Sequence, residues 1–171
     1  MSDRNNAGNG IQPGEENGKP KVSIQGFEGC FHQEAARIFF GNAVEVICCS
    51  TFKEVIDIAG NKKKSDGGVM AIENSIAGSI LPNYNLLQKS NLTIVGEVYL
   101  QINQHLMVNP GVELADIKEV HSHPMAIQQC FGFLDKHNWQ LVEKEDTALS
   151  TKQVHQTRSN IVAAIASNLA A

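Results

Sequence analysis

Short apolar runs alternate with segments of helical periodicity along the first half of the chain. The runs over 21–25, 44–49 and 67–72 predict strands, and the segments over 31–40, 52–59 and 81–88 predict helices. The second helix has clear boundary signals: Thr51 can cap its start, Glu54 occupies the capping-box position and Gly60 follows its end. This β-α-β-α-β-α order predicts a mainly parallel sheet covered by helices, which is an α/β fold.

The second half repeats this alternation less regularly. Strands are expected over 104–108, 117–121, 139–143 and 161–166, and helices over 125–137 and 147–156. Pro124 marks the start of the first of these helices, and Asp146 with Thr147 caps the second. Between the two halves, residues 92–102 form a long run in which apolar side chains alternate with others.

The stretch from Val69 to Ser79 joins a buried-strand pattern to a polar turn. In open α/β sheets, ligands bind just beyond the carboxyl ends of the strands, where Glu73, Asn74 and Ser75 are expected to lie. These residues offer a carboxylate, an amide and a hydroxyl. The alternative is a plain polar turn in which Asn74 or Ser75 caps the next helix, and the spacing by itself favours that simpler explanation.

Three turns share this strand–turn–helix pattern, namely Gly26–Gly29, Glu73–Ser75 and Ser122–Pro124. Each places backbone N–H groups and the positive end of a helix at the carboxyl edge of a sheet, which suits carboxylate binding. The glycines have GxxG spacing and lack the GxGxxG of a dinucleotide site. His121 and His123 could suggest a metal site, but the sequence offers no third ligand at a suitable spacing, so a capping histidine at a strand end is favoured.

The amino-terminal residues differ in composition from the rest of the chain. Residues 1–20 are rich in Asn, Gly and Glu and contain one aliphatic residue, Ile11, so we expect a disordered tail. The tail has no apolar core of signal-peptide length, and its acidic residues argue against an organelle transit peptide. No apolar stretch approaches the roughly 20 residues that span a bilayer. These features predict a cytoplasmic protein with no membrane partner.

The net charge of −4 and the pI of about 5.8 give no general attraction to nucleic acid or to anionic membranes. A solvated turn explains the single basic run, Lys62–Lys64, better than a phosphate site does. The four cysteines form no CxxC pair and are expected to be reduced and mostly buried. A nucleophilic Cys30 activated by His32, two residues away, is a weaker alternative.

Several motifs together resemble prephenate dehydratases and the plant arogenate dehydratases, which share the same catalytic domain. In chain order, they are Gly26–Phe31, Ile72–Ser75 with Gly78–Ser79, Ser122–Pro124 with Gln129–Cys130, Asp146–Ala148, and Ala163–Ser167. The resemblance covers residues 21–171. It implies a two-lobed α/β fold like that of the type II periplasmic binding proteins, with lobes over 21–98 and 99–171 and the active site between them.

The resemblance also implies an activity. The expected enzyme is a carbon–oxygen lyase of L-phenylalanine biosynthesis that converts prephenate into phenylpyruvate, water and carbon dioxide, with no metal or organic cofactor. Prephenate is a small dicarboxylate, so helix ends and amide or hydroxyl donors are expected to bind it, and loss of its ring hydroxyl needs a proton donor. The substrate-binding residues that the resemblance implies are Gly29, Cys30, Phe31, Glu73, Asn74, Ser75, Gly78, Ser122, His123, Asp146 and Thr147. Family members usually form dimers, so a homodimer is a possible assembly.

The chain also departs from the family pattern. Cys30 stands where the family usually has Thr, so a thiol replaces a hydroxyl that would face the ligand. Met125 stands where Gln is common, and Leu149 stands where Gly usually follows Asp-Thr-Ala. The first of these changes is expected to weaken a substrate contact.

The family's Thr-Arg-Phe motif, whose Thr is regarded as the catalytic hydroxyl, does not occur after Ser167, so no catalytic residue is assigned within the 171 residues. Thr157-Arg158-Ser159 lies upstream and lacks the Phe. A helix from Ser167 would end within about four residues, too few to be stable. We therefore expect a chain truncated at its C-terminus, without the ACT regulatory domain and with little or no activity. The alternatives are an inactive small-dicarboxylate binding module, a structural or oligomerisation role, and an arogenate dehydratase.

Overall fold

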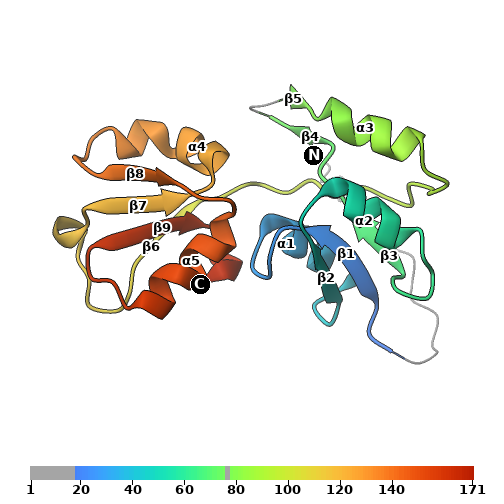
Figure 1. The fold of residues 1–171 in the computed structure, drawn as a ribbon, viewed down its shortest axis with the longest axis horizontal. Coiled ribbons are helices and arrows are strands. Elements are labelled where there is room, and N and C mark those ends of the chain that lie inside the picture. Colours follow the sequence, from blue (N-terminus) through green and yellow to red (C-terminus); the bar gives the residue numbers. More distant parts are fainter. Residues whose placement is uncertain (1–17, 76–77) are drawn as a thin grey trace, which may run out of the picture.

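The computed structural model describes residues 18–75 and 78–171, which form two lobes joined by an extended segment (Figure 1). The first lobe carries β1 to α3, and the second carries β6 to η2. The tail predicted over 1–20 lies outside the described residues, apart from 18–20. This is the two-lobed α/β architecture that the sequence predicts. The exact lobe boundary at 98/99 stays a prediction, because residues 91–104 carry no helix or strand.

The first sheet is parallel and has the strand order β2-β1-β3. Its strands and the helices of this lobe are β1 (Lys21–Gln25), α1 (Phe31–Phe40), β2 (Glu45–Cys49), α2 (Phe52–Ala59), β3 (Gly67–Val69) and α3 (Leu81–Gln88). Val22 and Ile24 of β1 pack in one core cluster with Ala36 of α1, whereas Ser23 Oγ donates to Val55 O of α2 at 3.0 Å. Since successive side chains of a strand point to opposite faces, α1 and α2 cover opposite faces of the sheet.

The second sheet has the order β6-β9-β7-β8, in which β6 is antiparallel to β9 and the other pairs are parallel. Its elements are β6 (His105–Met107), η1 (Leu114–Asp116), β7 (Glu119–Ser122), α4 (Pro124–Leu134), β8 (Gln140–Glu143), α5 (Thr147–Thr157), β9 (Val162–Ala166) and η2 (Asn168–Ala170). Its core joins Val120 and Ile165 of the sheet to Ile127 and Leu134 of α4.

The capping signals in the sequence explain why most predicted helices have the predicted bounds. Thr51 Oγ1 accepts the Glu54 N–H at 3.2 Å, while the Glu54 carboxylate accepts the Ser50 N–H at 2.9 Å. At the end of α1, Gly41 has φ 90° and donates its N–H to Arg37 O at 2.9 Å. The helices α1, α2 and α3 match the sequence prediction.

The predicted strand over 67–72 is wrong at its end, because β3 stops at Val69. After three intervening residues, 70–72, β4 (Glu73–Asn74) pairs with β5 (Gly78–Ser79) as a short antiparallel ladder. Residues 76 and 77 of the expected ligand stretch lie outside the described residues. The polar residues therefore do not lead directly from a strand of the main sheet into a helix.

The apolar segment that joins the lobes forms no regular secondary structure, and several of its side chains are exposed. Residues 92–102 carry no helix or strand, and the side chains of Ile94, Val95 and Tyr99 are 72%, 63% and 87% exposed. The helix predicted from Ser167 is the single 3-10 turn η2. No helix of the described residues is long and apolar enough to cross a membrane.

Candidate functional site

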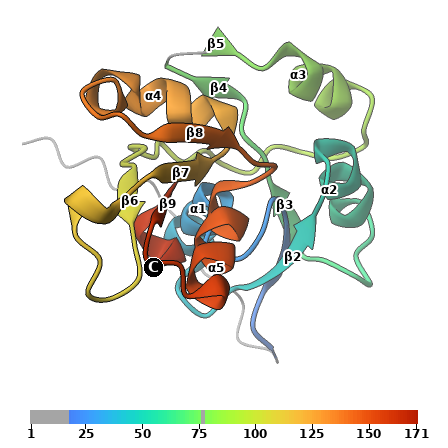
Figure 2. The ribbon, with the colours of Figure 1, turned by 60° about the vertical axis from the view of Figure 1, so that its left-hand side comes forward.

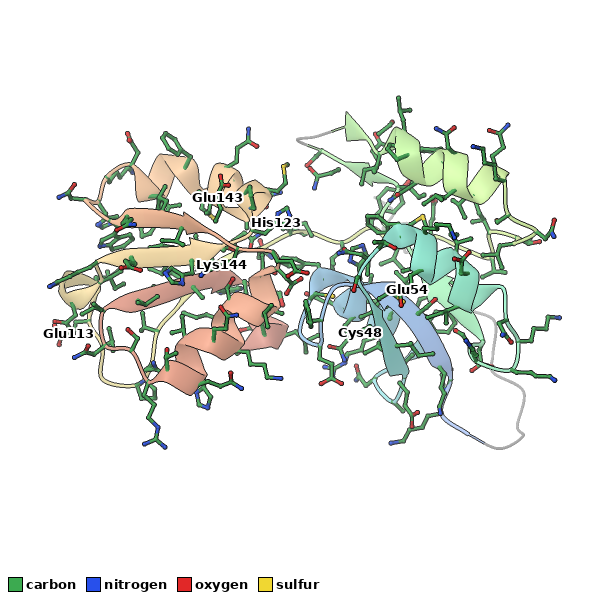
Figure 3. The ribbon with its side chains drawn as sticks, viewed as in Figure 1. Cys48, Glu54, Glu113, His123, Glu143 and Lys144 are labelled. Carbon is green, nitrogen blue, oxygen red and sulfur yellow. The ribbon has the colours of Figure 1, made fainter. Side chains whose placement is uncertain are left out.

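A cleft of about 210 Å³ lies between the lobes. The first lobe lines it at the carboxyl ends of β1 and β2, with Gln25, Gly26, Phe27, Cys48, Cys49 and Ser50. The second lobe lines it with Glu145 and Asp146, just before α5. Figure 3 shows Cys48 in the first lobe and His123 in the second, both close to the junction of the lobes. The cleft thus lies where the α/β architecture predicts a ligand site.

The turn after β1 allows the lobes to approach each other. Gly26 has φ 102°, and its N–H donates to Cys49 O at 3.0 Å. A Cβ atom on Gly26 would lie 3.2 Å from Asp146 Oδ2 and 3.3 Å from Cys30 Sγ. Both the backbone conformation and the lack of space therefore favour glycine at this position.

Gly29 makes a closer contact with the second lobe. It has φ 89°, and a Cβ atom there would lie 2.9 Å from Ala170 Cα. The Ser167 hydroxyl donates to Gly29 O at 2.5 Å in a buried hydrogen bond. Ala148 of α5 is part of the core cluster of the first lobe, and Ala170 packs against it. The lobes therefore share an apolar contact, in agreement with the position of α5 next to the first lobe (Figure 2).

Asp146 combines a structural role with a position in the cleft. It is the N-cap of α5, and its Oδ1 accepts the Leu149 N–H at 2.8 Å. Burial raises the pKa of the Asp146 carboxyl, while hydrogen bonds from Leu149 and Ala148 and the charge of His123 act in the opposite direction. The capping bond holds this carboxyl at the edge of the cleft.

Cys30 and His32 lie at the start of α1. Burial raises the pKa of the Cys30 thiol to about 11, and the thiol lies 3.6 Å from Gln25 O as a donor. Burial lowers the pKa of His32 to about 4, and its ring packs edge-on against Phe52. A neutral thiol hydrogen-bonded to the backbone is a poor nucleophile, which argues against the alternative of a Cys30–His32 pair.

Two predicted residues of the β7–α4 turn have structural partners. The Ser122 hydroxyl is buried and donates to Ile165 O at 2.6 Å, so it connects neighbouring strands. His123 caps α4 by accepting the Met125 N–H on Nδ1 at 3.2 Å, as the sequence predicts. His121 Nε2 lies 2.9 Å from Glu119 Oε2. Within this turn, His123 is the residue that affects the cleft lining, because its charge lowers the pKa of the Asp146 carboxyl.

The structure brings only some of the predicted residues to the cleft. Asp146 lines it, and Cys30 lies beside Gly26. Gly29 belongs to the turn after β1, and Phe31 and Thr147 are the first residues of α1 and α5, which begin at the border of the cleft. Six predicted residues are outside the cleft lining: Ser122 and His123 belong to the β7–α4 turn, and Glu73, Asn74, Ser75 and Gly78 are on the β4–β5 ladder and its turn. Their role in binding stays a prediction.

Sequence reasoning did not select the residues that the end of β2 contributes. Cys48, Cys49 and Ser50 line the cleft because β2 lies next to β1 and ends at the same edge, with Cys48 in register with Ile24. The strand–turn–helix pattern of 44–51 was a usable signal, since Thr51 starts a helix directly after this strand. Glu145 also lines the cleft, and the only sequence signal for it is its position directly before Asp146, the N-cap of α5.

Comparisons with known proteins agree with this architecture. A family model described as "Prephenate dehydratase" matches residues 22–171. The chain is 38% identical over 151 residues to "Arogenate dehydratase/prephenate dehydratase 2, chloroplastic" of Arabidopsis thaliana, covering 88% of this chain and 39% of that protein. It is 33% identical over 150 residues to the "Bifunctional chorismate mutase/prephenate dehydratase" of Escherichia coli K12, covering 86% and 39%. The chain thus spans about two fifths of the length of these curated relatives.

Solved structures show the same fold. Prephenate dehydratase from Arthrobacter aurescens, in complex with L-Phe, superposes with a TM-score of 0.78 at 28% identity, covering 88% of this chain and 51% of that chain. A protein described as "GqqA- a novel type of quorum quenching acylases" has the same TM-score at 29% identity, covering 88% and 54%. Because the family model matches nearly all of the described residues, this chain belongs to the prephenate dehydratase family.

Proposed function

We propose that this chain binds prephenate in the cleft between its lobes and is part of a prephenate dehydratase of L-phenylalanine biosynthesis. The observation that carries the proposal is the family match over 22–171, together with a cleft that several of the matching motifs border. In the proposed reaction, the ring hydroxyl leaves as water and a carboxylate leaves as carbon dioxide. The electron pair of the broken C–C bond completes the aromatic ring of phenylpyruvate.

The helix starts around the cleft support this function. α1, α2 and α5 begin after Cys30, Thr51 and Asp146, and residues at or next to these three starts line or border the cleft. Amide groups at the start of a helix favour negative charge, with an effect of about 0.3–1 kcal/mol at exposed sites. We propose that these starts bind the substrate carboxylates. On this view Gly29, Cys30, Phe31 and Thr147 position the substrate. His123 acts on Asp146 through its charge, and Ser122 holds the end of β7 against β9.

The proposed contribution of Glu73, Asn74, Ser75 and Gly78 is less direct. These residues lie on the β4–β5 ladder and its turn. The ladder follows β3 in the chain, and β3 belongs to the sheet whose strands β1 and β2 end at the cleft. We propose that they contact the substrate from outside the residues that line the cleft.

Binding and turnover test this function separately. Calorimetry with prephenate on the purified 171-residue chain should give saturable binding, and phenylpyruvate formation can be followed by its absorbance. Replacing the exposed, cleft-lining Cys48 by Trp should abolish binding by filling the cleft, whereas Lys62→Trp, in an exposed turn, should not. Absence of both binding and turnover would overturn the proposal. Binding with little or no turnover is expected from these 171 residues, which contain no Thr-Arg-Phe motif, and a small-dicarboxylate binding module would give the same result. Turnover at a normal rate would contradict the expected low activity and exclude the binding module.

We also propose that copies of the chain associate and that the protein is cytoplasmic. Ile94, Val95 and Tyr99 are exposed on an extended segment, which is a typical site for association. Sedimentation should therefore show a dimer that Tyr99→Glu weakens, and a monomer at all concentrations would contradict it.

Cell fractionation tests the proposed cytoplasmic location. The measurement is informative because a similar plant protein is described as chloroplastic.

A further inference from the structure

A second cavity lies between the lobes, apart from the proposed substrate cleft. Its volume is about 360 Å³, and it shares no lining residue with that cleft. The first lobe lines it with three residues of α1 and one residue after the helix, and η2 of the second lobe adds two more. These residues are Glu34, Arg37, Ile38, Asn42, Asn168 and Leu169. None of them has a part in the proposed reaction.

The position of η2 against the start of α1 builds this α1–η2 cavity. The Ser167 hydroxyl, directly before η2, donates to Gly29 O at 2.5 Å, and a Cβ atom on Gly29 would lie 2.9 Å from Ala170 Cα. Residues 37 and 38 follow residue 34 by three and four positions, so these side chains share one face of α1. The cavity therefore has one wall from each lobe, and a buried hydrogen bond holds the walls together.

The wall that α1 contributes carries two opposite charges that do not neutralise each other. Glu34 and Arg37 form no ion pair, and neither side chain makes a hydrogen bond with another of the described residues. The Nε atom of Arg37 is buried and is without a hydrogen-bond partner in this part of the chain. Because buried polar groups normally have such partners, this nitrogen at the edge of a cavity indicates a ligand that accepts from it.

The two charges restrict the class of ligand. A guanidinium binds a carboxylate with up to two parallel hydrogen bonds, and a carboxylate binds an ammonium. Glu34 would repel a simple anion, and Arg37 would repel a simple cation. A small zwitterion that carries both a carboxylate and an ammonium satisfies both side chains.

The remaining lining residues indicate what else the ligand carries. The amides of Asn42 and Asn168 offer further donors and acceptors to its polar groups. Ile38, which is 58% exposed, and Leu169 offer apolar contact to a side chain. We propose that the α1–η2 cavity binds a free α-amino acid with a branched aliphatic side chain, such as leucine. Since its walls belong to different lobes, the bound amino acid stabilises the packing of the lobes against each other.

Calorimetry on the 171-residue chain with leucine and two analogues tests this site. The analogue 4-methylpentanoate lacks the ammonium of leucine, and 3-methylbutylamine lacks its carboxylate. Leucine should bind with a Kd below about 1 mM and at least about tenfold more tightly than either analogue. Excess prephenate should not displace leucine, because the cavity and the cleft have separate linings.

Charge variants assign each contact. Arg37→Gln should weaken leucine binding about tenfold and remove its preference over 3-methylbutylamine, and Glu34→Gln should remove the preference over 4-methylpentanoate. Arg158→Gln, at the exposed C-cap of α5, is the matched control and should leave all three affinities unchanged. If Arg37→Gln does not fold, Asn168→Asp tests the same contact from the other wall. It should weaken the binding of leucine and 4-methylpentanoate, but not that of 3-methylbutylamine.

Several results would overturn the proposal. Without saturation at about 10 mM leucine there is no specific site, and equal affinity for leucine and its analogues would show apolar contact alone. Displacement by prephenate would assign leucine to the substrate cleft, and unchanged preferences in both charge variants would exclude the two proposed contacts. Failure of prephenate to bind would overturn only the proposed function, because the leucine titration needs no prephenate.

Discussion

The turn after β1 and the segment after β3 leave the same parallel sheet in the same direction, but they have different surroundings. The β1 turn leads directly into α1, and Gly26 and Gly29 lie against Asp146 and Ala170 of the second lobe. The β3 segment continues into the β4–β5 ladder, where Gly78 has nothing within 4 Å of its Cβ position. Both segments carry motifs of the family, but among the described residues only the glycines of the first, Gly26 and Gly29, are buried against the second lobe.

This difference shows what builds the cleft. A polar motif near the carboxyl end of a strand is a common feature of α/β sheets, and it becomes part of a cleft when a second lobe packs against it. For the β1 turn, glycines permit that packing because a side chain would collide with the partner lobe. No described residue of the β3 segment lines the cleft.

The largest expected effect comes from Gly29→Ala. A Cβ atom would meet Ala170 Cα at 2.9 Å in a backbone with φ 89°, so both collision and strain oppose it. We expect a loss of about 4 kcal/mol in the free energy of unfolding, measured by urea denaturation. Gly78→Ala is the matched control, with φ 74° and open space, and should cost about 1 kcal/mol. Equal losses in the two variants would contradict the proposed difference between the segments.

A pH dependence should follow from the burial of His32 at the start of α1. Burial lowers its pKa from 6.5 to about 4 in the folded state, so the unfolded chain binds more protons between these values. The stability contribution is complete above pH 6.5 and falls as the pH decreases toward 4, by no more than about 3 kcal/mol.

The test is the free energy of unfolding measured at several pH values between 4 and 7. His32→Gln should flatten the slope in this range, whereas His155→Gln, in the exposed last turn of α5, controls for the loss of a histidine. If His32→Gln keeps the full slope, other groups cause the pH dependence.

Local signals made most of the elements predictable. The helix starts at Thr51, His123 and Asp146 follow from capping chemistry that involves residues close in sequence. The early end of β3 at Val69 was not predictable in this way, because the apolar run continues to Ile72 and strand length depends on the partner strand.

The cleft depends on contacts between residues far apart in the chain. The approach of Asp146 to Gly26 and the hydrogen bond from Ser167 to Gly29 connect the two lobes. Periodicity cannot reveal such contacts. The strand–turn–helix pattern over 44–51 could indicate this edge of the sheet, but only the structure shows that Cys48 and Ser50 line the cleft together with the second lobe.

A smaller loss in the free energy of unfolding is expected when Asp146, the N-cap of α5 that lies against Gly26, is replaced. Asp146→Ala removes the hydrogen bond to the Leu149 N–H and should destabilise the chain by about 1 kcal/mol. Asp146→Asn should cost only a few tenths of that value, since Asn is a comparable cap. Thermal unfolding of both variants measures the difference, and similar losses would show that the charge matters more for stability than the cap.

The central claim is that the substrate binds between the β1 turn and the start of α5. Protection of cysteines from a thiol reagent, located by mass spectrometry, tests it directly because Cys48 is exposed and lines the cleft. Cys130 of the second lobe packs against that lobe's own core and serves as the internal reference. Saturating prephenate or arogenate should slow the modification of Cys48 several-fold and leave that of Cys130 unchanged. If calorimetry shows that the ligand binds while Cys48 reacts at its original rate, the substrate site lies elsewhere and the claim is wrong.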